Sequence, residues 1–288
     1  MTLGPYDFVQ PERASLPPCR LAKRRHMSSN IHAGTEQMAA QLEARQTIRQ
    51  RWKHDAGDLL IAHELAFSAL SSMIDRFSGR KFAHQPKAIE GRLSLLAQFV
   101  QGVEICETAI SEGLSSQAAA LLKQELETLA AVDEFTLNTR RDGVTPNIKN
   151  GPLSGFGPLY GELNNIAHPS RHDVVRQLAT IETGSICAPT TIPQYNAELI
   201  RLFYGYHVYF IVEMTKRAAA VFRHLFNEEL SDDEAHWASR ALAILLEEKV
   251  INFHPEVPPI SWTPEHLCSR SPQWPESTHR TRRSSGGK

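Results

Sequence analysis

Five polar residues stand at spacings that could assemble a site for acid–base chemistry. Tyr160, Asn164 and His168 follow one another at intervals of four residues, so a helix would carry all three on one face. Lys123 and Glu127 are one helical turn apart earlier in the chain. If the two faces meet, His168 beside a carboxylate could act as a general acid or base. The structural alternative is a Lys–Glu surface pair and a histidine favoured at a helix C-terminus by the dipole.

A resemblance to a known group is carried by two stretches, QGVEICETAISEGLSSQAAALLKQELE and YGELNNIAHPS. Between residues 92 and 178 the chain resembles uncharacterised bacterial all-helical proteins, some of which are related to HEPN domains. Proteins of that group often carry a basic residue four positions before a glutamate. Lys123 and Glu127 match this pattern, although the basic residue in the group is more commonly Arg than Lys. They then carry tyrosine, leucine, a small polar residue and histidine, matched by Tyr160, Leu163, Asn164 and His168. The resemblance implies a helical bundle and, since HEPN domains include RNases, a role in bacterial defence or toxin–antitoxin systems.

The HEPN nuclease signature, Arg-x(4–6)-His, gives a second set of candidates. Five matches occur in the chain, and its Arg and His content predicts about three by chance, so the signature has little specificity here. Arg217 and His224 form the best match, because positions seven apart share a helix face. Glu213 and Glu228 stand one turn outside this pair, so two ordinary surface ion pairs are an equally good interpretation.

Metal and nucleotide sites are not predicted. His168 and His172 with Asp173 suggest metal ligands, but Pro169 interrupts the helical geometry that would align them. The chain contains no HExxH, CxxC, GxGxxG, P-loop or GxSxG motif. We therefore expect no metal and no cofactor. The chain has four cysteines, Cys19, Cys106, Cys187 and Cys268, which are far apart in the sequence. This spacing predicts free thiols in a reducing cytoplasm.

Charge and composition describe an acidic body between two basic ends. The net charge of −1 divides into +3 for residues 1–34, +2 for residues 255–288 and −6 for residues 35–254. An acidic body is a poor surface for the phosphate backbone of RNA. Both ends are rich in proline and poor in apolar residues, so we expect disordered tails. No apolar run is long enough to predict a membrane span.

The body, 35–254, is predicted to be an all-α bundle of roughly seven helices, because apolar residues recur at helical spacing. Gly113 is expected to end one helix of a hairpin in a left-handed cap. Ser231 and Glu234 predict a capping box at the start of the last helix. The segment 194–227 is apolar on several faces, so it should be central or form a subunit interface. The segment 184–193 is expected to be extended or irregular.

Three functions remain open at this point. The first, favoured narrowly because it needs no catalytic geometry, is a cytoplasmic binding or assembly module that forms a homodimer through 194–227. The second is a metal-independent HEPN-like RNase, with RNA as substrate and His168 or the pair Arg217–His224 as its catalytic groups. The third is a sensor for a small-molecule ligand, in a pocket lined by Tyr160, His168 and the aromatic residues of 203–210.

Overall fold

The computed structural model describes residues 27–81, 86–148, 152–168, 171–183 and 186–251. The chain divides into two compact units, Met1–Ala40 and Gln41–Lys288. Most of the predicted basic tails, 1–34 and 255–288, lie outside the described residues. The exception is the segment from Met27 onward, which belongs to the first helix. The predicted start of the helical body at residue 35 is therefore too late. No proline interrupts the stretch from Met27 to Asp55, which lets the helix extend toward the N-terminus.

Helices dominate the described residues, which confirms the all-α prediction. Eight α-helices are present there: α1 Met27–Asp55, α2 Leu59–Phe77, α3 Lys87–Ser111, α4 Ser115–Thr136, α5 Gly157–Ala167, α6 His172–Leu178, α7 Ala197–Phe226 and α8 Asp232–Glu247. A 3-10 turn, Ser154–Phe156, precedes α5. The strands β1 Thr180–Thr183 and β2 Ile186–Pro189 form an antiparallel hairpin, which the sequence did not predict. Strand β2 lies in the segment 184–193, which was predicted to be extended or irregular. The β-branched residues of this segment favour strand formation.

Local capping signals place several helix ends. Gly113 has a φ of +73° after the end of α3, and the amide N–H of Leu114 donates to the carbonyl of Ala109, as in a left-handed C-terminal cap. The side chain of Ser231 accepts from the amide of Glu234, whose side chain accepts from the Ser231 amide. Both caps confirm the sequence predictions. They set α3 against α4 and orient α8.

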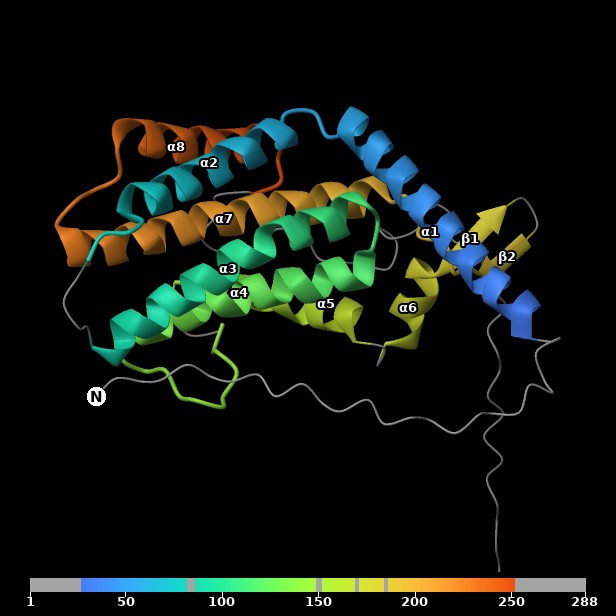
Figure 1. Ribbon diagram of the computed structural model, residues 1–288, viewed down its shortest axis with the longest axis horizontal. Helices are drawn as coiled ribbons and strands as arrows, with labels where there is room; N and C mark the ends of the chain where they lie inside the picture. Colours follow the sequence, from blue (N-terminus) through green and yellow to red (C-terminus); the bar gives the residue numbers. More distant parts are fainter. Residues whose placement is uncertain (1–26, 82–85, 149–151, 169–170, 184–185, 252–288) are drawn as a thin grey trace, which may run out of the picture. The chain divides into compact units, whose positions relative to one another are not determined.

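The second unit is built around α7. Figure 1 shows α7 between the pair α2 and α8 on one side and the pair α3 and α4 on the other. The helix contributes four almost completely buried aromatic side chains: Phe203, Tyr204, Tyr206 and Phe210. The segment 194–227 was predicted to be either central in the bundle or at a subunit interface, and the burial of these side chains shows that α7 is central. Helix α5 packs on α4, and its buried side chains Leu159, Leu163 and Ile166 belong to the same hydrophobic core.

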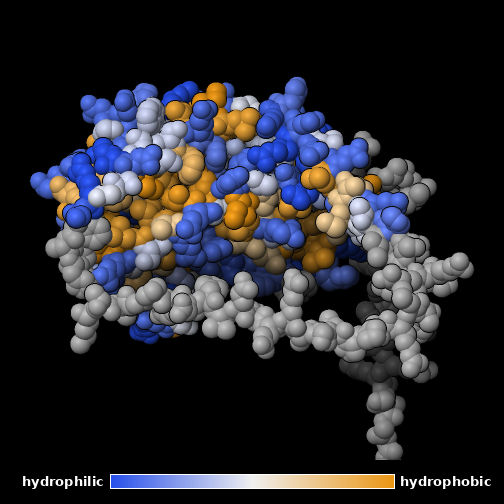
Figure 2. Space-filling view, viewed as in Figure 1, coloured by the Kyte–Doolittle hydropathy of each residue, from blue (hydrophilic) through white to orange (hydrophobic). Residues whose placement is uncertain are grey.

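Helix α3 is long and largely apolar. By length and composition it is the one candidate among the described helices for crossing a membrane, which is weak evidence because core helices pass the same test. Its inner face is buried in the bundle through Leu96, Phe99 and Val103. Its Ile105 side chain is 59% exposed. Figure 2 shows apolar surface in the middle of the visible face of the molecule, among hydrophilic residues.

Candidate functional site

The contact between α4 and α5 brings together three of the residues that the sequence singled out. The Tyr160 hydroxyl donates a hydrogen bond of 2.6 Å to Oε1 of Glu127. Lys123 Nζ lies 3.7 Å from the same oxygen and 5.5 Å from the centre of the Tyr160 ring. Burial, and then the hydrogen bond to Glu127, raise the pKa of Tyr160 to about 12. The group is internally satisfied and partly exposed, so it stabilises the α4–α5 contact.

The other two residues of the predicted cluster do not complete it. Asn164 is half-buried on α5, one turn after Tyr160. His168 follows the end of α5 with extended backbone angles, φ −105° and ψ 134°, and its side chain is exposed. The sequence placed His168 on the same helix face as Tyr160, which is wrong. The physical reason is Pro169, because a residue that precedes proline is driven out of the helical region.

Among the described residues, the guanidinium of Arg217 pairs with two carboxylates and not with His224. Two guanidinium nitrogens of Arg217 donate to the two carboxylate oxygens of Asp133, at 2.9 and 2.7 Å. A third nitrogen donates to Glu213 at 2.7 Å, as in the surface-pair interpretation. His224 is exposed, and Glu228 pairs with two arginines at the end of α2 instead of with His224. Arg217 therefore ties α7 to α4 and has no free edge for a phosphate.

A different cluster of ionisable side chains lies at the centre of the bundle. His207 is completely buried and Glu125 is 5% exposed. Nδ1 of His207 lies 2.9 Å from Oε1 and 3.1 Å from Oε2 of Glu125. Cys106 is adjacent, and one ligand atom from each of these three residues lies within 4.8 Å of the others. The ring of His63 stacks on His207, with the ring centres 5.3 Å apart.

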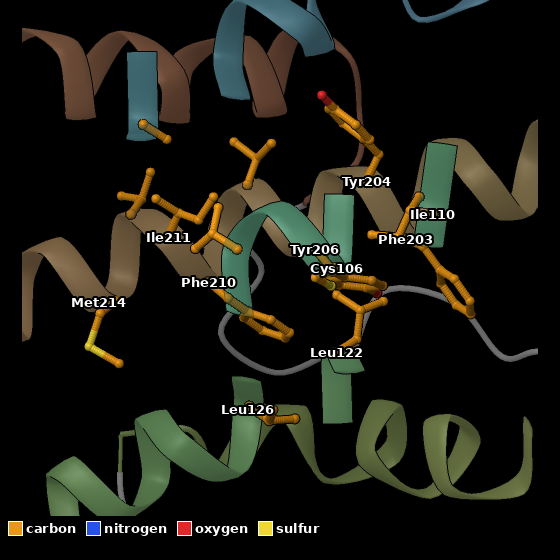
Figure 3. Packing of buried hydrophobic residues seen from close by; sticks show 14 of the residues in the cluster. Cys106, Ile110, Leu122, Leu126, Phe203, Tyr204, Tyr206, Phe210, Ile211 and Met214 are labelled. Atoms are coloured by element: carbon orange, nitrogen blue, oxygen red, sulfur yellow. The ribbon is translucent and has the colours of Figure 1, made fainter. Parts of the chain in front are cut away.

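We call these four residues the core cluster: His63, Cys106, Glu125 and His207. Each comes from a different helix, α2, α3, α4 and α7 in that order. Figure 3 shows Cys106 within the packing between α3 and α7, near Ile110, Leu122 and Tyr206. Facing helices of a bundle build ligand and metal sites in this way.

The electrostatics of the core cluster are strongly perturbed. Burial, followed by the charge of His207, lowers the pKa of His63 to about 3, so His63 is neutral at neutral pH. Burial and the neighbouring Glu125 raise the pKa of the Cys106 thiol well above its ordinary value. Nε2 of His63 and Nε2 of His207 are buried and have no hydrogen-bond partner among the described residues. Perturbed, incompletely paired groups of this kind are concentrated at functional sites.

Space is available beside the core cluster. A cavity of about 30 Å³ lies between α3 and α4, close to the volume that one water molecule occupies in the liquid. Cys106 and Glu125 both line it, together with Gln98, Phe99, Gly102, Leu121, Gln124 and Thr128. A molecule the size of water therefore fits next to the thiol and the carboxylate.

A larger cavity of about 500 Å³ lies at the end of α4 and the loop that follows it. Arg140 lines this cavity but already donates to Glu134 and to the backbone carbonyls of Arg141 and Val144. The pocket that the sequence predicted is a different one, lined partly by the aromatic residues of 203–210. Four of those aromatic side chains are packed into the core instead.

Sequence reasoning did not connect the members of the core cluster, because they lie far apart in the chain. Each nevertheless carries a local signal, since each polar side chain interrupts an apolar helical stripe. Glu125 lies between Leu122 and Leu129, and His207 lies between Phe203 and Ile211. A charged residue in such a stripe is rarely buried without a partner. Known metal-binding motifs combine ligands that are close in sequence, so no such motif connects these residues.

No protein-family model, curated protein or solved structure matches this chain.

Proposed function

We propose that this chain is a helical binding module of the HEPN-like type and that it holds a small ligand in its core cluster. The observation that carries the proposal is the buried pair of His207 and Glu125, together with Cys106, at the meeting point of four helices. Burying a carboxylate and an imidazole away from water costs desolvation free energy, roughly several kcal/mol for each group that carries a charge, and an apolar pair would cost less. A ligand that binds these groups would explain why the bundle contains them.

The RNase alternative finds less support in the same geometry. Arg217 is held by Asp133 and Glu213, and neither His168 nor His224 makes a hydrogen bond or ion pair to it among the described residues. The core cluster lies inside the bundle, where a polynucleotide has no access. The acidic body is also unfavourable for RNA. Binding to a partner protein or to a second copy of the chain remains compatible with a binding module.

The proposal is tested by two measurements on the full chain. The first incubates the protein with total tRNA and a chelator, beside His168→Ala and His224→Ala variants whose folds are checked by circular dichroism. We expect no cleavage in any sample. Cleavage that disappears in one folded variant would identify a nuclease and contradict the proposal.

The second measurement compares the native and denatured masses of the protein as purified from cells. We expect a bound species in the native spectrum that is lost on denaturation. It should be weakened in a folded variant of the core cluster, such as Cys106→Ala. A native mass equal to that of the bare chain, under several growth conditions, would contradict a ligand in the core.

A further inference from the structure

We propose that Cys106, Glu125 and His207 bind one divalent transition-metal cation of the zinc type. This inference rests on the proposed function, because it names the class of ligand that the core cluster holds. The three residues offer one sulfur, one oxygen and one nitrogen atom from three different helices. The sequence predicted no metal site.

The donor set selects the class of metal. Zn²⁺ takes thiolate, imidazole and carboxylate ligands, whereas Ca²⁺ and Mg²⁺ prefer oxygen alone. In a tetrahedral zinc site with bonds of about 2.0–2.3 Å, the ligand atoms stand roughly 3.5 Å apart. The atoms of this site already lie within 4.8 Å of one another without an ion. Small side-chain rotations of Cys106, Glu125 and His207 would close the remaining difference.

The charges of the three side chains match a dication. A Cys106 thiolate and a Glu125 carboxylate together bring two negative charges into a buried volume, and one M²⁺ ion neutralises both. On binding, the S–H bond of Cys106 breaks, the thiolate sulfur coordinates the metal, and the proton is released to solvent. The imidazole of His207 coordinates through Nδ1 and keeps its other nitrogen protonated.

The surroundings provide a fourth position and an orienting contact. The cavity of about 30 Å³ beside Cys106 and Glu125 has room for one water molecule as the fourth ligand. His63 stacks on the ring of His207 with an interplanar angle of 25° and is outside the group of three ligands. His63 is therefore a positioning residue that fixes the plane of the His207 imidazole.

The test uses Co²⁺ as a spectroscopic probe on the full chain, purified with reductant and stripped with a chelator. Thiolate coordination gives a charge-transfer absorption that other ligand types lack. We expect one Co²⁺ per chain with this absorption, and its displacement by one equivalent of Zn²⁺. Cys106→Ala should abolish the absorption. It should also weaken binding by more than about 100-fold, beyond the 10–100-fold effects typical of outer-shell partners.

Two further variants keep the result decisive. Cys106→Ser replaces the thiolate by a hydroxyl of similar size and should also lose the absorption, even if Cys106→Ala does not fold. His172→Ala is the matched control, because it removes an exposed histidine from the motif that the sequence suggested, and it should bind like the wild-type chain.

A wild-type chain without the absorption, or an absorption that persists in folded Cys106→Ala and Cys106→Ser, would overturn the metal site. The fate of the proposed function is read separately, from the native mass of the untreated protein. A bound non-metal species there would leave the binding module standing and reject only the metal. A bare chain would reject both.

Discussion

Replacing His207 by leucine should strongly destabilise the metal-free protein. The side chain is completely buried, and its Nδ1 is the nearest nitrogen partner of the Glu125 carboxylate, at 2.9 Å. Leucine has a similar volume, so the variant mainly removes the polar partner rather than opening a cavity. Among the described residues, the thiol of Cys106 would then be the remaining side-chain donor to Glu125, and a thiol is a weak donor.

The size of the effect follows from which group is left unpaired. His207→Leu removes the nearest nitrogen partner of a buried carboxylate, so it should lower the free energy of unfolding by about 3–5 kcal/mol. Glu125→Leu leaves the imidazole of His207 without its hydrogen-bond acceptor, so we expect a loss of about 1–3 kcal/mol. The double variant, Glu125→Leu with His207→Leu, leaves no unpaired polar group of this pair. It should lie within about 1 kcal/mol of the wild type, since apolar replacement of a buried pair is often neutral.

Urea unfolding followed by circular dichroism, at pH 7 with chelator and reductant, measures all four proteins. The midpoint should drop in the order wild type, Glu125→Leu and His207→Leu, and it should recover in the double variant. The slope with urea should stay constant, so that the midpoints report stability. If the cost of the double variant equals the sum of the two single costs, the residues do not form the coupled pair described here.

Three further predictions concern single positions. The pKa of His63 is about 3 in the folded protein and 6.5 in the unfolded chain, so the folded protein holds His63 neutral. Its contribution to the free energy of unfolding is therefore fully present above pH 6.5 and is lost as the pH falls toward 3, because protons bind the unfolded chain first. In metal-free protein, lowering the pH from about 7.5 to about 5 should therefore reduce the free energy of unfolding by about 2 kcal/mol through His63. His63→Phe should remove this part of the dependence of the urea midpoint on pH. The same dependence in the variant as in the wild type would contradict a neutral, buried His63. Gly205→Ala should cost about 1–3 kcal/mol, because the new Cβ would lie 2.0 Å from Cγ1 of Val250; thermal melting with no loss would contradict this packing. Tyr160→Phe should cost about 1 kcal/mol by removing the hydrogen bond to Glu127, and urea unfolding with an unchanged midpoint would show that this bond contributes nothing.

The features that the sequence predicted correctly are local ones. Apolar periodicity placed the helices, and the caps at Gly113 and Ser231 follow from residues within a few positions. The sequence allowed extended structure at 184–193 but did not predict the hairpin at 180–189, because its strands are only four residues long. His168 was misplaced because helical periodicity was extended to the residue before Pro169, where the backbone leaves the helix.

The core cluster depends on contacts between residues far apart in the chain, and helical periodicity contains no information on which helices face one another. Glu125 and His207 are separated by 82 positions and meet only because α4 packs against α7. The sequence could have flagged each as a polar residue in an apolar stripe. Their pairing required the three-dimensional arrangement.

The most direct test of the central claim is a crystal structure of the protein grown with Zn²⁺, with diffraction data collected on both sides of the zinc absorption edge. We predict one anomalous peak between α3, α4 and α7, bonded to Sγ of Cys106, a carboxylate oxygen of Glu125 and Nδ1 of His207. Zinc found only at surface histidines, with His207 still paired to Glu125 alone, would contradict the account.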